Sequence, residues 1–361
     1  MKIKSVLNSK SKIISFIIGI IVLILTIIVI FAIVYMNNYK NPADKKLADA
    51  GIIEKTVQVG EVNFNYAEGP DNGPPLLLLH AQLLDWYTYN KVLPELSMKF
   101  HVFAVDYPGH GKTTVTDNYT FSANQIGSDL ADFMETVIKE PAYVTGNSSG
   151  GLLTTWLAAN KPELVKAIVL EDPPLFSSEY PEIKKTIAYK SFTTSNSAIE
   201  NGYDGDFLNY WIKNSAKFFD TYAFSGSQQL IEFAVNSYRK ANPGQPVEIA
   251  FLPSTVQEML RGLNYYNPSF GNAFYEGTWN EGFDHAEALQ KIQCPALLLH
   301  ANFEITEDGI LDGAISQEQA DKVVSLIPNC AYKKIDSLHV VNLDHPDEFS
   351  KIIEDFFFLG Q

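Results

Sequence analysis

The chain has 361 residues, of which 46% are hydrophobic, and its formal net charge is −15. This length suits one large α/β domain that carries an insertion, or two domains, and it is sufficient to bury a sizeable core. The acidic balance argues against a nucleic-acid partner, because nucleic-acid binding depends on Lys and Arg side chains that neutralise phosphates.

The first recognisable segment is an uncharged apolar run at residues 13–36. As a helix it would be about 36 Å long, enough to cross a hydrocarbon core of about 30 Å. A cleaved signal peptide would have a shorter apolar core of about 7 to 15 residues, followed by small residues. The run therefore favours an uncleaved transmembrane anchor. Residues 1–12 are basic, which predicts a cytoplasmic tail and a single-pass protein of the cell membrane whose main domain is extracellular.

A polar stalk is predicted at residues 37–53, and strands alternate with helices from residue 54 to residue 361. Most of the later strands are nearly continuous apolar runs, as expected for strands covered on both faces. The alternation predicts a mostly parallel sheet with helices on both faces. The expected strands cover residues 55–60, 62–69, 75–81, 101–108, 141–147, 167–172, 295–301 and 332–336, and the expected helices cover residues 85–98, 122–139, 150–160, 316–326 and 347–358.

The alternation is interrupted at about residues 174–290, a segment rich in Tyr, Phe and Trp. Helical periodicity at residues 227–241 and 256–263 predicts a helical cap over the carboxyl edge of the sheet. Cys294 and Cys330 each fall just before a predicted strand, so a disulfide is possible if those strands are neighbours. The alternative is two small buried apolar residues.

The segment "TGNSSGG" contains two adjacent serines after an apolar strand and before a predicted helix. Gly146, Ser148 and Gly150 form the pattern G-x-S-x-G, which is typical of a tight strand-to-helix turn that exposes a nucleophilic hydroxyl. Choosing Ser149 instead would place Asn147 at a position where a side chain fits poorly. The pattern therefore predicts Ser148 as the nucleophile.

From about residue 54 to its C-terminus, the chain resembles the α/β-hydrolase fold superfamily. Besides the serine motif, the resemblance rests on "LLLLHAQ", "DYPGHGKT", "ALLLHANFE" and "SLHVVNLDHPDEF". It implies an eight-stranded, mostly parallel α/β-hydrolase sheet with a helical cap insertion, preceded by one transmembrane helix. The last motif matches the region around the family's catalytic histidine and implies that His339 is the base.

The same resemblance implies an acid in the loop after the strand at residues 295–301. At the position matching the family's Asp the chain has Glu304, and Ala301 replaces the usual Gly. Asp308, four residues later, is an alternative acid. Asp172 is another, because it follows the preceding strand of the sheet and some relatives carry the acid there.

The oxyanion donors implied by the resemblance are the backbone amides of Gln82 and Ser149. Ala81 replaces a glycine that is usual in this loop, so the backbone there is expected to approach substrate less freely. Losing one such donor typically costs about 2.7 to 4 kcal/mol of transition-state stabilisation.

The order Ser148, Glu304, His339 is the order of nucleophile, acid and base expected on this fold. We expect a serine hydrolase that cleaves a carboxylic ester or lactone through an acyl-serine intermediate. Its substrate would be a moderately apolar small molecule with a carbonyl centre. A C–C bond hydrolase, an acyltransferase and a membrane-tethered binding protein without activity remain as alternatives. No metal-ligand spacing or phosphate-binding glycine loop is visible, so no metal and no cofactor are expected.

Overall fold

The computed structural model of the chain describes residues 2–359, and its described side chains run from residue 12 to residue 358. Of the basic tail predicted at residues 1–12, only the side chain of Lys12 is therefore described. The other lysines of that tail lie outside the described side chains, so the charge pattern there stays a prediction from the sequence.

All eight strands expected from the sequence are present and form one sheet in the order β1-β2-β4-β3-β5-β6-β7-β10. Strand β2 runs antiparallel to both of its neighbours, and the remaining pairs are parallel. The predicted eight-stranded, mostly parallel sheet is thus confirmed. The strands are β1 (Ile53–Val59), β2 (Val62–Glu68), β3 (Pro75–Leu79), β4 (His101–Asp106), β5 (Ala142–Asn147), β6 (Val165–Glu171), β7 (Ala296–His300) and β10 (Cys330–Lys334).

Strand β3 shows why its sequence is apolar without interruption. Leu77 and Leu79 belong to the core cluster that includes α4 (Ala123–Phe133) and α5 (Ser149–Asn160), whereas Leu76 and Leu78 belong to the cluster that includes α3 (Leu93–Leu96) and α15 (Pro346–Leu359). Successive side chains of a strand point to opposite faces. The sheet is therefore covered by helices on both sides.

The helix expected at residues 85–98 is interrupted. The structure has a 3₁₀ turn, η1 (Trp86–Tyr89), and then the short helix α3. Pro94 lies within the first turn of α3, and proline has no N–H with which to continue a helix from the preceding turn. The helices expected near residues 316–326 and 347–358 are present as α13 (Gln317–Leu326) and α15.

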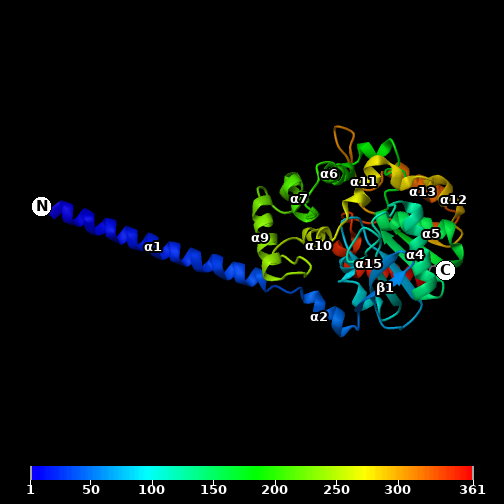
Figure 1. Ribbon diagram of the computed structural model, residues 1–361, viewed down its shortest axis with the longest axis horizontal. Coiled ribbons are helices and arrows are strands. Elements are labelled where there is room, and N and C mark those ends of the chain that lie inside the picture. The colour runs from blue at the N-terminus through cyan, green and yellow to red at the C-terminus, as the bar shows by residue number, and fades with distance from the viewer. Residues whose placement is uncertain (1, 360–361) are drawn as a thin grey trace.

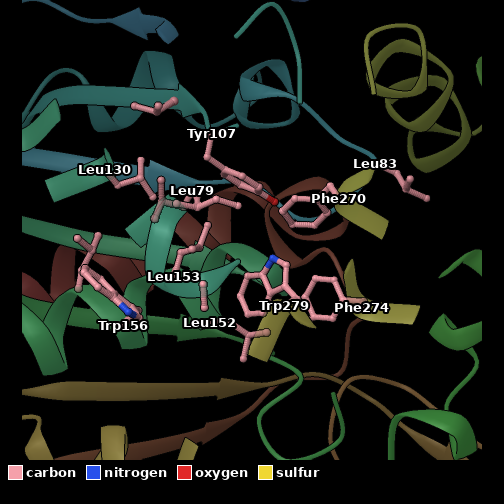
Figure 2. Packing of buried hydrophobic residues seen from close by; sticks show 14 of the residues in the cluster. Leu79, Leu83, Tyr107, Leu130, Leu152, Leu153, Trp156, Phe270, Phe274 and Trp279 are labelled. Atoms are coloured by element: carbon pink, nitrogen blue, oxygen red, sulfur yellow. The ribbon is translucent and has the colours of Figure 1, made fainter. Parts of the chain in front are cut away.

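The segment between β6 and β7 is helical, as expected for a cap. Its aromatic side chains continue the core of the sheet domain. Figure 2 shows Trp279 between Phe274 and Leu152 of α5, and Phe270 beside Tyr107, and all of these residues belong to one buried cluster. The cap helices are α6 (Ala188–Glu200), α7 (Phe207–Asn214), α8 (Ala216–Tyr222), α9 (Gln228–Ala241), α10 (Ser254–Leu263) and α11 (Pro268–Glu276), and α12 (His285–Lys291) then returns to pack against α5.

The N-terminal helix α1 (Lys2–Asn37) projects away from the rest of the molecule, and the short helix α2 (Pro42–Asp49) follows it (Figure 1). Large apolar side chains from Ile13 to Tyr35 are exposed along it. Within the described residues, this is the one helix long and apolar enough to cross a membrane.

The two cysteines carry free thiols, so the disulfide considered from the sequence is not formed. Burial raises the pKa of both Cys294 and Cys330 to about 11. They fit the alternative of small, partly buried apolar residues.

Candidate active site

Ser148 lies at the turn between β5 and α5, with φ of 56° and ψ of −120°. A non-glycine residue in such a conformation is strained by about 1–3 kcal/mol and is found mainly at functional sites. The turn is held by the Ser148 amide, which donates to the carbonyl oxygen of Glu171 at 3.0 Å. The side chain of Ser148 is partly exposed, whereas Ser149 is only 2% exposed. The exposed hydroxyl at this turn therefore belongs to Ser148.

The two glycines around the serine leave no space for a side chain. A Cβ atom on Gly146 would lie 2.3 Å from the carbonyl oxygen of Gly150. A Cβ atom on Gly150 would lie 2.1 Å from the carbonyl oxygen of Leu79 and 2.6 Å from that of His80. The G-x-S-x-G spacing thus lets the loop after β3 pack directly against the turn that carries Ser148.

His339 lies in the loop between β10 and α14 (Val341–Asp344), and its Nδ1 is 2.7 Å from Oδ2 of Asp172. Asp172 is 1% exposed, and its Oδ1 accepts a hydrogen bond from the Ala301 amide at 3.2 Å. Both carboxylate oxygens therefore have partners. The Asn147 side chain donates to the carbonyl oxygen of His339 at 3.0 Å, which ties the histidine loop to the residue before Ser148.

The expectation that Glu304 contacts the histidine must be corrected. Glu304 is exposed in a small antiparallel hairpin formed by β8 (Glu304–Ile305) and β9 (Leu311–Asp312), and Asp308 is exposed in its turn. The chain after β7 enters this hairpin instead of directing a carboxylate at His339. The structure brings Asp172, the third carboxylate considered, to the imidazole. Its position after β6, the neighbour of β5, is the sequence signal that pointed to it.

The two expected oxyanion donors come from adjacent segments. Ser149 begins α5, and Gln82 lies in the loop after β3 that packs against Gly150. The side chain of Gln82 donates to the hydroxyl of Tyr266 in the cap at 2.8 Å. This hydrogen bond fixes the conformation of the Gln82 side chain. The Ser149 hydroxyl lies 2.9 Å from that of Tyr107, which itself donates to the carbonyl oxygen of His80.

Three other titratable side chains near the site are buried, and burial shifts the pKa of each toward its neutral form. Burial lowers the pKa of His80 to about 4, and its Nδ1–H donates to the carbonyl oxygen of Ala81 at 2.8 Å. Burial also lowers the pKa of His110. Burial raises the pKa of Glu171 to about 8, although a hydrogen bond from Thr145 opposes this shift. The buried carboxylate at the imidazole of His339 is that of Asp172.

The cap is tied to the loop that carries Gln82 by the ion pairs of Arg261. Arg261 of α10 donates from Nε to Asp85 at 3.2 Å and from a terminal nitrogen to Glu248 at 3.1 Å. The Asp85 carboxylate also accepts from the amide of Tyr87, and the guanidinium of Arg261 lies 3.9 Å from the centre of the Tyr87 ring. Because Asp85 is three residues after Gln82, this ion pair holds the cap and the loop together.

Solved structures resemble the chain over most of its length. A membrane phospholipase A superposes with a TM-score of 0.63 and 20% identity, covering 95% of this chain and 97% of that one. A carboxylesterase from Bacillus subtilis superposes with a TM-score of 0.60 and 19% identity, covering 88% of this chain and 96% of that one. At such identities the likeness shows the fold.

Curated relatives match shorter stretches. A pimeloyl-[acyl-carrier protein] methyl ester esterase from Vibrio parahaemolyticus is 36% identical over 113 residues, which are 30% of this chain and 41% of that protein. The magnesium-chelatase 30 kDa subunit of Rhodobacter capsulatus is 35% identical over 94 residues, which are 26% of this chain and 33% of that protein. The chain thus matches between a third and about two fifths of the length of these relatives.

The model of the alpha/beta hydrolase fold family matches residues 74–346, which include the serine turn, Asp172, the cap and His339. The order of the strands and the position of the cap between β6 and β7 agree with that match. The chain belongs to the α/β-hydrolase fold family.

Proposed function

We propose that the protein is a serine hydrolase that cleaves a carboxylic ester or lactone, with Ser148 as nucleophile, His339 as base and Asp172 as acid. The observation that carries this proposal is the 2.7 Å contact between His339 and the buried Asp172, in a loop that Asn147 ties to the serine turn. The names of the relatives, which include ester hydrolases, support the reaction class.

In the proposed reaction, the Ser148 hydroxyl attacks the substrate carbonyl carbon while its proton passes to Nε2 of His339. Asp172 accepts from Nδ1–H, which leaves Nε2 free to take that proton and stabilises the imidazolium that forms. The amides of Gln82 and Ser149 donate to the oxyanion. His339 then protonates the leaving oxygen, the acyl-serine forms, and a water molecule deprotonated by His339 releases the acid and restores Ser148.

Hydrolysis of p-nitrophenyl esters of increasing acyl length by the full chain in detergent tests the proposal. Ser148→Ala is expected to reduce turnover by roughly a thousandfold or more. Ser149→Ala is the matched control, because it keeps the backbone amide at residue 149, and it is expected to retain activity within about tenfold of the unchanged protein. Full turnover by Ser148→Ala would exclude the proposed nucleophile. A chain inactive on every ester would favour the C–C bond hydrolase or the binding protein.

We propose further that α1 anchors the protein in the cell membrane with residues 1–12 in the cytoplasm and the hydrolase domain outside. The exposure of apolar side chains along α1 supports the anchor, and the lysines of the tail support the orientation. Protease added to intact cells should digest the hydrolase domain. A domain that is digested only after the cells are opened would reverse the orientation.

A further inference from the structure

The end of α1 contacts the cap. Asn37, the last residue of α1, accepts hydrogen bonds from the Ser237 hydroxyl at 3.2 Å and from the Asn242 side chain at 2.9 Å. Two residues earlier, the ring of Tyr35 lies 5.3 Å from that of Phe251. The cap is therefore the part of the hydrolase domain that adjoins the point where α1 would leave a membrane.

Helix α9 has apolar residues on two faces. Ile231, Val235 and Tyr238 are buried in the cap, whereas Leu230 and Phe233 are 62% and 57% exposed. Residues three and four apart lie on one face of a helix. Leu230, Phe233 and Ser237 therefore share a face, and that face contacts Asn37 through Ser237. Leu230 and Phe233 thus give α9 an exposed apolar face in addition to its buried one.

The position of this face relative to α1 indicates what covers it. In Figure 1, α9 lies across the end of α1, on the side of the hydrolase domain from which α1 projects. The exposed apolar run of α1 extends to Tyr35, about 3 Å along the axis before Asn37. The headgroup layer beyond the hydrocarbon core is about 5 to 8 Å thick on each side. A side chain beside Asn37 thus lies at the depth of this layer.

Phe251 adds an aromatic ring at the same depth. It is 80% exposed and has a φ of 71°, a conformation that bulky residues rarely adopt. Its ring is nevertheless packed beside Tyr35. Aromatic rings at the headgroup level are typical of proteins that contact a membrane interface.

The stalk does not act as a loose tether between α1 and the domain. The Asn41 amide donates to Glu248 at 3.3 Å, and Glu248 is paired with Arg261, which also binds Asp85. The Tyr87 hydroxyl donates to Asp44 of α2 at 2.5 Å. These bonds fix the direction in which the cap faces relative to α1.

We propose that the cap face formed by Leu230, Phe233 and Phe251 lies in the headgroup layer of the bilayer that α1 crosses. The partner is the lipid surface, because this face adjoins the end of the apolar surface of α1, where Phe251 packs beside Tyr35 and Ser237 binds Asn37. This inference rests on the proposed anchor and is independent of the reaction at Ser148. It implies that the cap, which packs on the oxyanion loop, is in contact with the membrane while the site works.

Quenching of tryptophan fluorescence by brominated lipid tests the proposal. The four native tryptophans are all at least 93% buried: Trp86, Trp156, Trp211 and Trp279. Their emission is measured on the unchanged protein and subtracted as background. The full chain with Phe233→Trp is placed in phosphatidylcholine vesicles with plain or brominated acyl chains. We expect brominated lipid to reduce at least twofold the emission that the substitution adds.

Phe358→Trp is the matched control, because Phe358 is 45% exposed and belongs to α15, which Figure 1 shows apart from α1 and α9. Its added emission should not be quenched. Flotation of the vesicles selects the chains that are bound to them. If F233W is not quenched in these bound chains, or if both variants are quenched equally, the proposal is overturned. Protection of F233W from aqueous acrylamide without quenching by brominated lipid would show a second protein copy on this face and also overturn it. Chains that do not float with vesicles would refute the anchor itself, whatever the ester assay shows.

Discussion

Replacing Asp172 by Asn is expected to reduce kcat by roughly 10⁴, or about 5.5 kcal/mol of transition-state stabilisation. The oxygen Oδ1 of Asp172 accepts from the Ala301 amide, whereas Oδ2 faces Nδ1 of His339. An Asn at this position would keep its oxygen on Ala301 and turn its NH₂ group toward the imidazole. His339 would then accept at Nδ1 and carry its proton on Nε2. In that tautomer it cannot take the proton of Ser148.

The matched controls for this change are Glu304→Gln and Asp308→Asn, which remove the other two carboxylates considered for the same role. Both side chains are exposed in the hairpin or its turn, so we expect kcat within about twofold of the unchanged protein. The assay is hydrolysis of one p-nitrophenyl ester with kcat and KM measured separately, and thermal unfolding checks that each variant is folded. Loss of activity in Glu304→Gln together with full activity in Asp172→Asn would exclude Asp172 as the acid.

Three further predictions concern the structure around the site. Arg261→Ala leaves the buried Asp85 without its ion-pair partner and should lower the free energy of unfolding by about 3 to 5 kcal/mol. Arg239→Ala breaks the more exposed pair with Asp206 and should lower it by about 1 kcal/mol or less. Urea unfolding measures both, and equal effects would exclude a special contribution of the buried pair. Gly150→Ala should abolish ester hydrolysis and lower the melting temperature, since its methyl group would overlap the Leu79 carbonyl oxygen; an active variant with unchanged melting would show that the turn has room. Burial raises the pKa of Glu171 from an ordinary 4.5 to about 8. Between pH 4.5 and pH 8 the folded chain therefore binds a proton at Glu171 that the unfolded chain has lost. Its contribution to stability is full below about pH 4.5 and is lost as the pH rises through 8, with a slope of up to about 1.4 kcal/mol per pH unit. Relative to Glu171→Gln, the unchanged protein should therefore lose stability between pH 5 and pH 8 in urea unfolding, and parallel pH profiles would exclude this role.

The sheet could be predicted from the sequence because its strands are apolar runs at positions that the helices between them cover on both faces. The interruption of the helix expected at residues 85–98 could have been recognised from Pro94, which lacks the N–H that a continuous helix needs. The β8–β9 hairpin could not, because strands of two residues are too short to show any periodicity. Glu304 and Asp308 are exposed in this hairpin or its turn, whereas the carboxylate that contacts His339 is that of Asp172.

Ser148 and His339 could be selected as candidates from the sequence because each lies within a motif whose spacing reflects local geometry. For Ser148 this is the tight glycine turn, and for His339 it is the loop before the last two helices. The partner of His339 depends on contacts between segments that are 167 residues apart in the sequence. Asp172, Glu304 and Asp308 all follow strands at the carboxyl edge of the sheet, and the family pattern favoured Glu304 over the other two. Two tertiary features decide which carboxylate contacts His339. The chain after β7 leads Glu304 and Asp308 into the exposed hairpin, and the Ala301 amide orients the Asp172 carboxylate.

In the proposed reaction, Ser148 is the residue that becomes acylated. The most direct test is to treat the full chain with a fluorophosphonate, which reacts with activated serine hydroxyls, and to identify the modified residue by peptide mass spectrometry. We expect one adduct on Ser148, no adduct in Ser148→Ala, and greatly reduced labelling in Asp172→Asn. An adduct on Ser149, or an unlabelled chain that still hydrolyses esters, would contradict it.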